Sequence, residues 1–189
     1  MSQPILRTAR AELVPLADEH LEFEVELDSD PEVLRYLEPR ARTRREVEAA
    51  HRRRIAAAKE IPGLGFWVGF IRGEFIGWWI LQPPHGPDQP REPGEADLGY
   101  RLLRRYWRQG LASEASRELL RYGFEDMGLK RIFAQTMAAN QPSRATMASI
   151  GMTFVRAFPG DFPEPLPGSE HGEVEYAITF EQWQATNHT

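Results

Sequence analysis

The stretch RRYWRQGLASEA, residues 104–115, joins a cationic aromatic run to the start of a helix through a single glycine, Gly110. Before it, the alternating run ADLGYRL at residues 96–102 is typical of a strand. After it, apolar residues at four-residue spacing predict a helix over residues 109–126. The stretch therefore predicts a strand, a tight turn and a helix whose N-terminus lies at that turn.

A helix N-terminus of this kind is suited to binding an anion. Its first N–H groups have no partner within the helix and lie at the positive end of the helix dipole, where phosphate binds. Gly110 would let the backbone approach the anion with no side chain in the way. Cationic side chains add positive potential nearby: Arg104, Arg105 and Arg108. A plain tight turn with its arginines in solvent explains the stretch equally well, and the sequence contains neither GxxxxGK[ST] nor GxGxxG.

Composition limits the class of protein. The 189 residues, of which 41% are apolar, are enough for one domain with its own core, residues 1–189. The absence of cysteine excludes disulfides and cysteine nucleophiles, and the five histidines show no metal-ligand spacing, so we expect no metal. A net charge of −5 disfavours nucleic acid as a partner and permits a cationic amine. With neither a signal peptide nor a long apolar window, we expect a cytoplasmic protein and no membrane partner.

The rest of the chain is predicted to form one mixed α/β domain. Thr43 and Glu46 form a capping-box pattern that begins a long helix ending near Glu60, and Asp30-Pro31 predicts a shorter helix before it. Two aromatic runs joined at residues 72–73 predict a hairpin. The expected strands cover residues 5–15, 65–71, 74–81, 96–102, 131–138, 152–158 and 173–180, and other helices cover residues 16–28 and 142–151.

Two side-chain groups have a structural interpretation. The basic run at residues 51–54 lies in a helical pattern rich in Arg, Glu and Ala, which favours a solvated helix face. The tryptophans Trp67, Trp78 and Trp79 could line an acceptor pocket, but aromatic strand residues are more often part of a core.

Several motifs resemble those of the GNAT family of N-acetyltransferases. The segment WRQGLASEA, residues 107–115, resembles the family's acyl-CoA pyrophosphate loop, [QR]-x-x-G-x-[GA], with Trp107 at the first position. ADLGYRL resembles the E-[IL]-G-Y strand of the Rim-type ribosomal-protein N-terminal acetyltransferases, with Asp97 in place of the glutamate. Further segments resemble this subgroup in the same order and extend the likeness over nearly the whole chain: LDSDPEVLRYL (27–37), NQPSRATMASIGM (140–152) and EYAITFEQW (175–183).

The resemblance implies a fold, a reaction and a set of cofactor-binding residues. The fold is α/β and single-domain, with a mixed, mostly antiparallel sheet that is splayed in the middle and flanked by helices. The reaction is the direct attack of an amine on the thioester of acetyl-CoA, through a tetrahedral intermediate. The implied acetyl-CoA-binding residues are Arg104, Trp107, Arg108, Gln109, Gly110, Leu111, Ala112, Ser113, Gln135, Met137, Asn140 and Ser143.

The catalytic groups follow from the same resemblance. Asp97 takes the subgroup's position for a base, and Glu175 on the last strand is a second candidate, although either could be an ordinary solvent-facing carboxylate. Ser143 is the candidate acid, because Met147 stands where many family members have a tyrosine. A backbone amide near residues 135–137, or on the strand ending at residue 103, would hold the oxyanion. Asn140 would contact the cofactor arm, and a helix cap explains it equally well.

The acceptor and the assembly are open at this stage. The acceptor is expected to be a small-molecule amine or a protein N-terminus. The alternatives are a CoA-binding module without turnover and a protein that binds a nucleotide or phosphosugar at the same helix. We expect a homodimer, because Rim-type relatives are often dimers and the aromatic hairpin supplies more apolar surface than one chain obviously needs.

Overall fold

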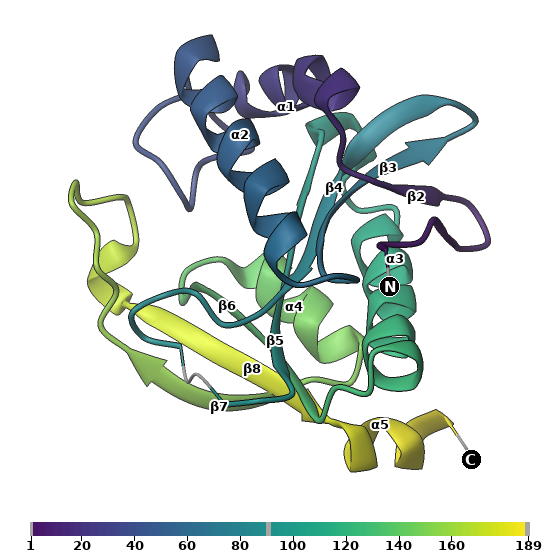
Figure 1. The fold of residues 1–189 in the computed structure, drawn as a ribbon. Helices are drawn as coiled ribbons and strands as arrows, with labels where there is room; N and C mark the ends of the chain where they lie inside the picture. The colour runs from purple at the N-terminus through teal and green to yellow at the C-terminus, as the bar shows by residue number, and fades with distance from the viewer. Residues whose placement is uncertain (1, 90–91, 188–189) are drawn as a thin grey trace.

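The computed structural model describes residues 2–89 and 92–187 (Figure 1). Eight strands form one sheet in the order β1-β2-β3-β4-β5-β6-β8-β7. Every neighbouring pair is antiparallel except β5 and β6, which are parallel. The strands are β1 (Leu6–Arg7), β2 (Glu12–Pro15), β3 (Gly65–Ile71), β4 (Glu74–Gln82), β5 (Glu95–Leu102), β6 (Arg131–Met137), β7 (Thr153–Phe158) and β8 (Glu173–Thr179). The mixed, mostly antiparallel sheet flanked by helices confirms the fold that the family resemblance implies.

Helices cover both faces of this sheet. On one face α1 and α2 pack against β3 and β4, and on the other α3 and α4 pack against the central strands (Figure 1). The helices are α1 (Leu21–Asp28), α2 (Arg44–Glu60), α3 (Leu111–Arg121), α4 (Gln141–Ser149) and α5 (Phe180–Asn187). Among the described residues, no helix combines the length and the apolar composition needed to cross a membrane.

The aromatic hairpin β3–β4 is the centre of the core. Its two strands are covered by helices on both faces, which explains why they are nearly continuous apolar runs in the sequence. Trp67 and Trp79 are fully buried on the α3 side, and Trp78 is buried on the α1 side. These aromatic side chains are therefore core residues, and they leave little surplus apolar surface for a second subunit. The expected homodimer remains a prediction that rests on the family resemblance.

The sheet is splayed between β5 and β6. Within the described part of the chain, these strands pair only where Glu95–Asp97 meets Arg131–Phe133. Asp97 is the last residue of β5 in the paired region. The splay therefore leaves a wedge-shaped gap whose vertex lies at Asp97 and Phe133.

Three expected elements differ in the structure. The first strand is divided into β1 and β2 by a turn in which Thr8 donates its N–H to the carbonyl of Ala11 (2.9 Å). Residues 31–37 form successive turns instead of a helix, because the segment before Pro39 is too short to nucleate one. The helix at residues 109–126 consists of α3 followed by a π-helical turn, Tyr122–Asp126.

The basic run at residues 51–54 is not simply a solvated face. His51 is buried and hydrogen-bonds the buried carboxylate of Glu24, which also receives the guanidinium of Arg54. Only Arg52 and Arg53 are exposed in this run. The side chains at residues 51 and 54 therefore join α2 to α1, and the solvated-face interpretation is wrong for both.

Candidate active site

The N-terminus of α3 is free to receive an anion. Gly110 is its N-cap residue and has a left-handed backbone (φ 76°), with no side-chain cap from the described residues. The carbonyl of Gly110 accepts the first intrahelical bond, from Glu114 (3.0 Å). The N–H groups of residues 111–113 therefore lie in the unpaired first turn. This turn has the backbone geometry that the sequence predicts for a pyrophosphate site.

A cation from the other end of the chain lies beside this turn. Arg10, between β1 and β2, donates to the carbonyl of Gln109 (2.9 Å) and to the carboxylate of Glu114 (2.7 Å). A Cβ atom added at Gly110 would lie 3.5 Å from its guanidinium. No sequence motif indicated this residue, because about a hundred positions separate it from the loop.

The arginines of the loop itself are partly engaged elsewhere. Arg104 forms an ion pair with Asp30 (2.8 Å), and Arg105 pairs with Glu26 (3.0 Å). Their charges are therefore partly compensated, and they contribute less positive potential at α3 than the sequence predicts. The indole of Trp107 donates to the carbonyl of Leu102 (2.9 Å), which ties the loop to the end of β5.

The β5 side of the gap carries backbone donors without a strand partner. Leu103 donates its N–H toward β4, to the carbonyl of Ile76 (2.9 Å). Because an antiparallel ladder alternates along the strand, the N–H groups of Tyr100 and Leu102 point away from β4 and toward β6. These groups lie beyond the last described pair with β6 and so face the gap.

The β6 side has the same property. Ala138 donates its N–H toward β8, to the carbonyl of Gly172 (2.9 Å). The same alternation directs the N–H groups of Gln135 and Met137 toward β5. The gap is therefore lined by backbone amides on both sides, which are the candidate donors to a pantetheine arm or to an oxyanion.

The start of α4 brings a hydroxyl pair to this gap. Asn140 is the N-cap residue of α4, since its side chain accepts from the N–H of Ser143 (3.3 Å). The hydroxyl of Ser143 lies 3.0 Å from that of Tyr100 on β5. Burial raises the pKa of Tyr100 to about 12, against the hydrogen bonds from its hydroxyl neighbours. Met147, at the position where many family members have a tyrosine, lies on α4 and is part of the core. The phenol near Ser143 is instead that of Tyr100, on β5.

Asp97 is a buried carboxylate, and the imidazole of His85 lies 3.7 Å from it. The side-chain amide of Gln89, in the proline-rich loop between β4 and β5, donates to its carboxylate (3.0 Å). Burial raises the pKa of Asp97 to about 7, Gln89 acts against this shift, and the negative charge of Glu175 adds to it. A carboxylate in this state takes up and releases a proton near neutral pH.

Glu175 has the opposite environment. Its carboxylate accepts from Arg131 (2.7 Å), Gln135 (2.9 Å) and Arg156 (3.0 Å). Burial acts to raise its pKa, but these hydrogen bonds outweigh burial, so the pKa of Glu175 lies below its ordinary value. Glu175 is thus buried and hydrogen-bonded, so the solvent-facing alternative is wrong, and its role as a second candidate base stays a prediction.

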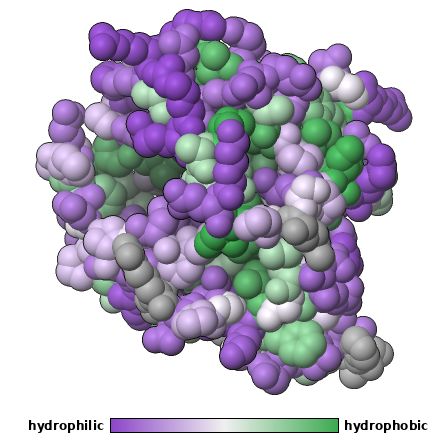
Figure 2. All heavy atoms as spheres, in the orientation of Figure 1, coloured by the Kyte–Doolittle hydropathy of each residue, from purple (hydrophilic) through white to green (hydrophobic). Residues whose placement is uncertain are grey.

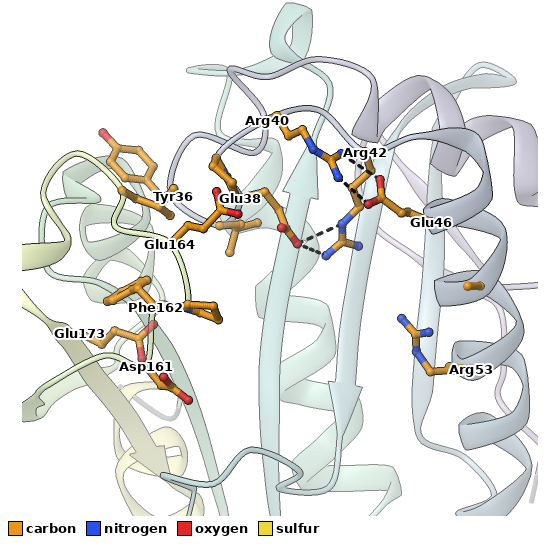
Figure 3. A pocket seen from close by; sticks show the side chains of 15 residues that line it. Tyr36, Glu38, Arg40, Arg42, Glu46, Arg53, Asp161, Phe162, Glu164 and Glu173 are labelled. Carbon is orange, nitrogen blue, oxygen red and sulfur yellow. Dashed lines mark hydrogen bonds and ion pairs between the residues drawn. The ribbon is translucent and has the colours of Figure 1, made fainter.

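A cavity of about 540 Å³ opens on the α1–α2 face of the molecule. Figure 2 shows a hollow on this side, with hydrophobic surface inside and hydrophilic side chains around it. Figure 3 shows its walls: the segment after α1, the helix α2, and the loop before β8. The lining residues are Tyr36, Leu37, Glu38, Pro39, Arg40, Arg42, Glu46, Ala49, Arg53, Asp161, Phe162, Pro163, Glu164, Leu166 and Glu173.

The cavity is negatively charged. Five carboxylates line it against three guanidinium groups. One of the carboxylates, Glu173, lies on β8 two residues before Glu175, and burial followed by the charge of Asp88 raises its pKa. The walls therefore favour a cationic guest. Nothing in the sequence grouped these residues, since they come from segments more than a hundred residues apart.

A family model matches most of the chain. Residues 10–153 match the model described as an acetyltransferase (GNAT) domain. A protein of Aspergillus fumigatus named "FsC-acetyl coenzyme A-N(2)-transacetylase" is 44% identical over 185 residues, which are 96% of this chain and 79% of that protein.

Solved structures share the fold. A GNAT-family acetyltransferase from Bacillus anthracis superposes with a TM-score of 0.76 at 22% identity and covers 94% of this chain and 99% of its own. RimL, a ribosomal L7/L12 α-N-protein acetyltransferase in complex with coenzyme A, gives a TM-score of 0.77 at 18% identity, over 93% of this chain and 98% of its own. At these identities the likeness is one of fold.

Proposed function

Because the chain belongs to the GNAT family of acetyltransferases and transfers an acetyl group from acetyl-CoA to an amine, we propose that its acceptor is a small molecule with an α-amine. The relative from Aspergillus fumigatus is named for transfer to an N(2) nitrogen, which in a derivative of an α-amino acid is the α-amine. The observation that carries the proposal is the negatively charged cavity of about 540 Å³, whose size suits a small molecule.

We place acetyl-CoA along the gap between β5 and β6. Its pyrophosphate would lie on the N–H groups of residues 111–113, with Gly110 allowing close approach and Arg10 adding a cation. Its pantetheine arm would run between the amides of Tyr100 and Gln135 toward the vertex of the splay. The donors fit the ligand, since phosphate needs unpaired N–H groups and the arm needs unpaired strand amides.

The reaction needs a neutral amine. An α-amine has a pKa near 8, so a large share of it is protonated at neutral pH. We assign Asp97 to take one proton from the ammonium group, directly or through a water, and to pass it to solvent. The nitrogen lone pair then attacks the thioester carbon, and a C–N bond forms as the carbonyl oxygen becomes an oxyanion held by a backbone amide.

Collapse of the intermediate breaks the C–S bond. The second proton of the amine ends on the departing sulfur, so that the products are the acetamide and free CoA thiol. We assign Ser143 to assist this step by donating a hydrogen bond to the sulfur, with the Tyr100 phenol supporting its hydroxyl. A thiol has a pKa near 8.5, so the leaving group needs only modest help.

A panel of acceptors tests the assignment. Purified protein is given acetyl-CoA with α-amino acid amides, alkyl amines, polyamines and short peptides, and release of CoA thiol is followed together with product mass. We expect the highest kcat/KM for small α-amines. A preference for peptide N-termini over every small amine would overturn the proposed acceptor class and leave the acetyltransferase activity standing.

A further inference from the structure

Arg53 is an uncommitted cation on one wall of the acceptor cavity. It projects from α2 into the hollow (Figure 3), and in the part of the chain that the structure describes it makes no hydrogen bond or ion pair. The other two cavity arginines are engaged: Arg40 pairs with Glu46 (2.7 Å), and Arg42 pairs with Glu38. Arg53 is therefore the guanidinium of this cavity that is available to a guest.

Carboxylates without an arginine partner within hydrogen-bonding distance lie on the facing wall. Asp161 and Glu164 come from the loop before β8, and Glu173 comes from the start of β8 (Figure 3). None of the three accepts a side-chain hydrogen bond from a described residue, although Arg40 lies near enough to Glu164 to interact with its charge. Among the described residues, the cavity is thus polarised, with an available cation on α2 and available anions opposite.

We propose that this cavity selects an amine that also carries an oxyanion, such as a carboxylate, separated from the amine by several bonds. The inference rests on the proposed function, because it takes this cavity as the acceptor site. Arg53 binds the oxyanion, and the carboxylates of the facing wall hold the ammonium group. Binding at both ends orients the acceptor with its nitrogen on the β8 side of the cavity.

The chemistry of the two walls supports this orientation. A guanidinium presents a planar set of donors that matches the two oxygens of a carboxylate, and such charge-assisted pairs are stronger than neutral hydrogen bonds. Glu173 lies on the same strand and the same face as Glu175, whose cross-strand partner is Gln135 beside the gap. An ammonium held by Glu173 would lie two residues along β8 from Glu175. Tyr36 and Phe162 add aromatic surface to the cavity lining, on the side of the carboxylates (Figure 3).

An isosteric pair of acceptors tests the proposal. L-Isoglutamine has an α-amine and a distal carboxylate, and L-glutamine amide has a carboxamide in place of that carboxylate. For the wild-type protein we expect kcat/KM for the carboxylate compound to exceed that for the amide by about tenfold or more, mainly through KM, as for one charge-assisted pair. Acceptors with one or two more methylene groups between the amine and the carboxylate show which separation of these two groups gives the highest kcat/KM.

Variants of two neighbouring arginines separate charge recognition from folding. Arg53→Gln should bring the ratio of kcat/KM for the carboxylate compound to that for the amide down to about one, whereas Arg53→Lys should restore part of this ratio. Arg52→Gln is the matched control, since Arg52 is exposed on the same helix and does not line the cavity. A wild-type protein that acetylates amines without preferring the carboxylate, or a preference that survives in Arg53→Gln, would overturn the inference. Failure to acetylate any small amine would instead overturn the proposed function.

Discussion

Replacement of Asp97 by asparagine should stabilise the fold, and the gain should depend on pH. In the folded chain the pKa of this carboxyl is about 7, against an ordinary value of 3.8. Between these values the unfolded chain is ionised at this position and the folded chain is protonated, so the folded state binds more protons. The free energy of unfolding of the wild type therefore falls as pH rises, by at most about 1.4 kcal/mol per pH unit.

The size of the effect follows from this interval. The loss begins near pH 3.8 and is complete above about pH 7, which gives an upper limit of about 4 kcal/mol. The Asp97→Asn variant has no such loss, because its amide does not titrate and can still accept from Gln89. Urea unfolding of both proteins should show that the variant's advantage is about 2 to 3 kcal/mol larger at pH 8 than at pH 5.

The same substitution tests catalysis. If Asp97 is the base, kcat/KM of the wild type should rise with pH and level off near pH 7. In Asp97→Asn this rise, the acid limb of the pH profile, should disappear, and kcat/KM at pH 8 should fall by roughly 10²-fold. His85 lies near the carboxylate, so His85→Gln serves as the control and should keep the limb. A pH-independent stability difference together with wild-type kinetics in Asp97→Asn would refute both assignments.

Other substitutions address the remaining assignments. Gly110→Glu should weaken CoA binding by about tenfold or more, roughly 1.4 kcal/mol, because charge and side chain enter the pyrophosphate site; calorimetry on the folded variant measures it, and Gly110→Ala controls for strain. Ser143→Ala should lower kcat by less than the roughly 10²-fold loss at Asp97 and leave CoA affinity intact; an equal or larger loss would make Ser143 the main proton-transfer group. Glu175→Gln should cost about 2 kcal/mol in urea unfolding, because Arg156 loses its counter-ion and Arg131 keeps only Glu95. The same change should move the rise of kcat/KM that Asp97 governs to lower pH, and a rise that stays in place would show that the two carboxylates do not interact.

Local sequence signals predicted the elements whose stabilising contacts are local. Thr43 and Glu46 form the expected capping box at the start of α2. The hairpin turn falls at the expected pair, since Arg72 (φ 50°) and Gly73 (φ 82°) both have left-handed backbones. In each case residues within four positions of one another determine the conformation. The splay and the parallel pair were expected only through the resemblance to a family.

Tertiary contacts decide what the sequence did not predict. The helix α5 has eight residues and little periodicity, and it is held by packing of Trp183 on Phe124 (5.5 Å between ring centroids). The same holds at the site, where Arg10 and Tyr100 reach their partners from distant segments. No local pattern marks such residues, because their role depends on which strands become neighbours.

The division of roles between Asp97 and Glu175 is the clearest case of this dependence. Both are acidic strand residues on the same face of the sheet, and nothing in the residue type separates them. Arg131 and Arg156 both bind Glu175, so the positive charge that would lower the pKa of Asp97 is engaged by its neighbour. The bound charge of Glu175 instead raises the pKa of Asp97 further. The lowered pKa keeps Glu175 ionised, and the raised pKa leaves Asp97 able to exchange a proton near neutral pH, which is the separation that the proposed proton transfer requires.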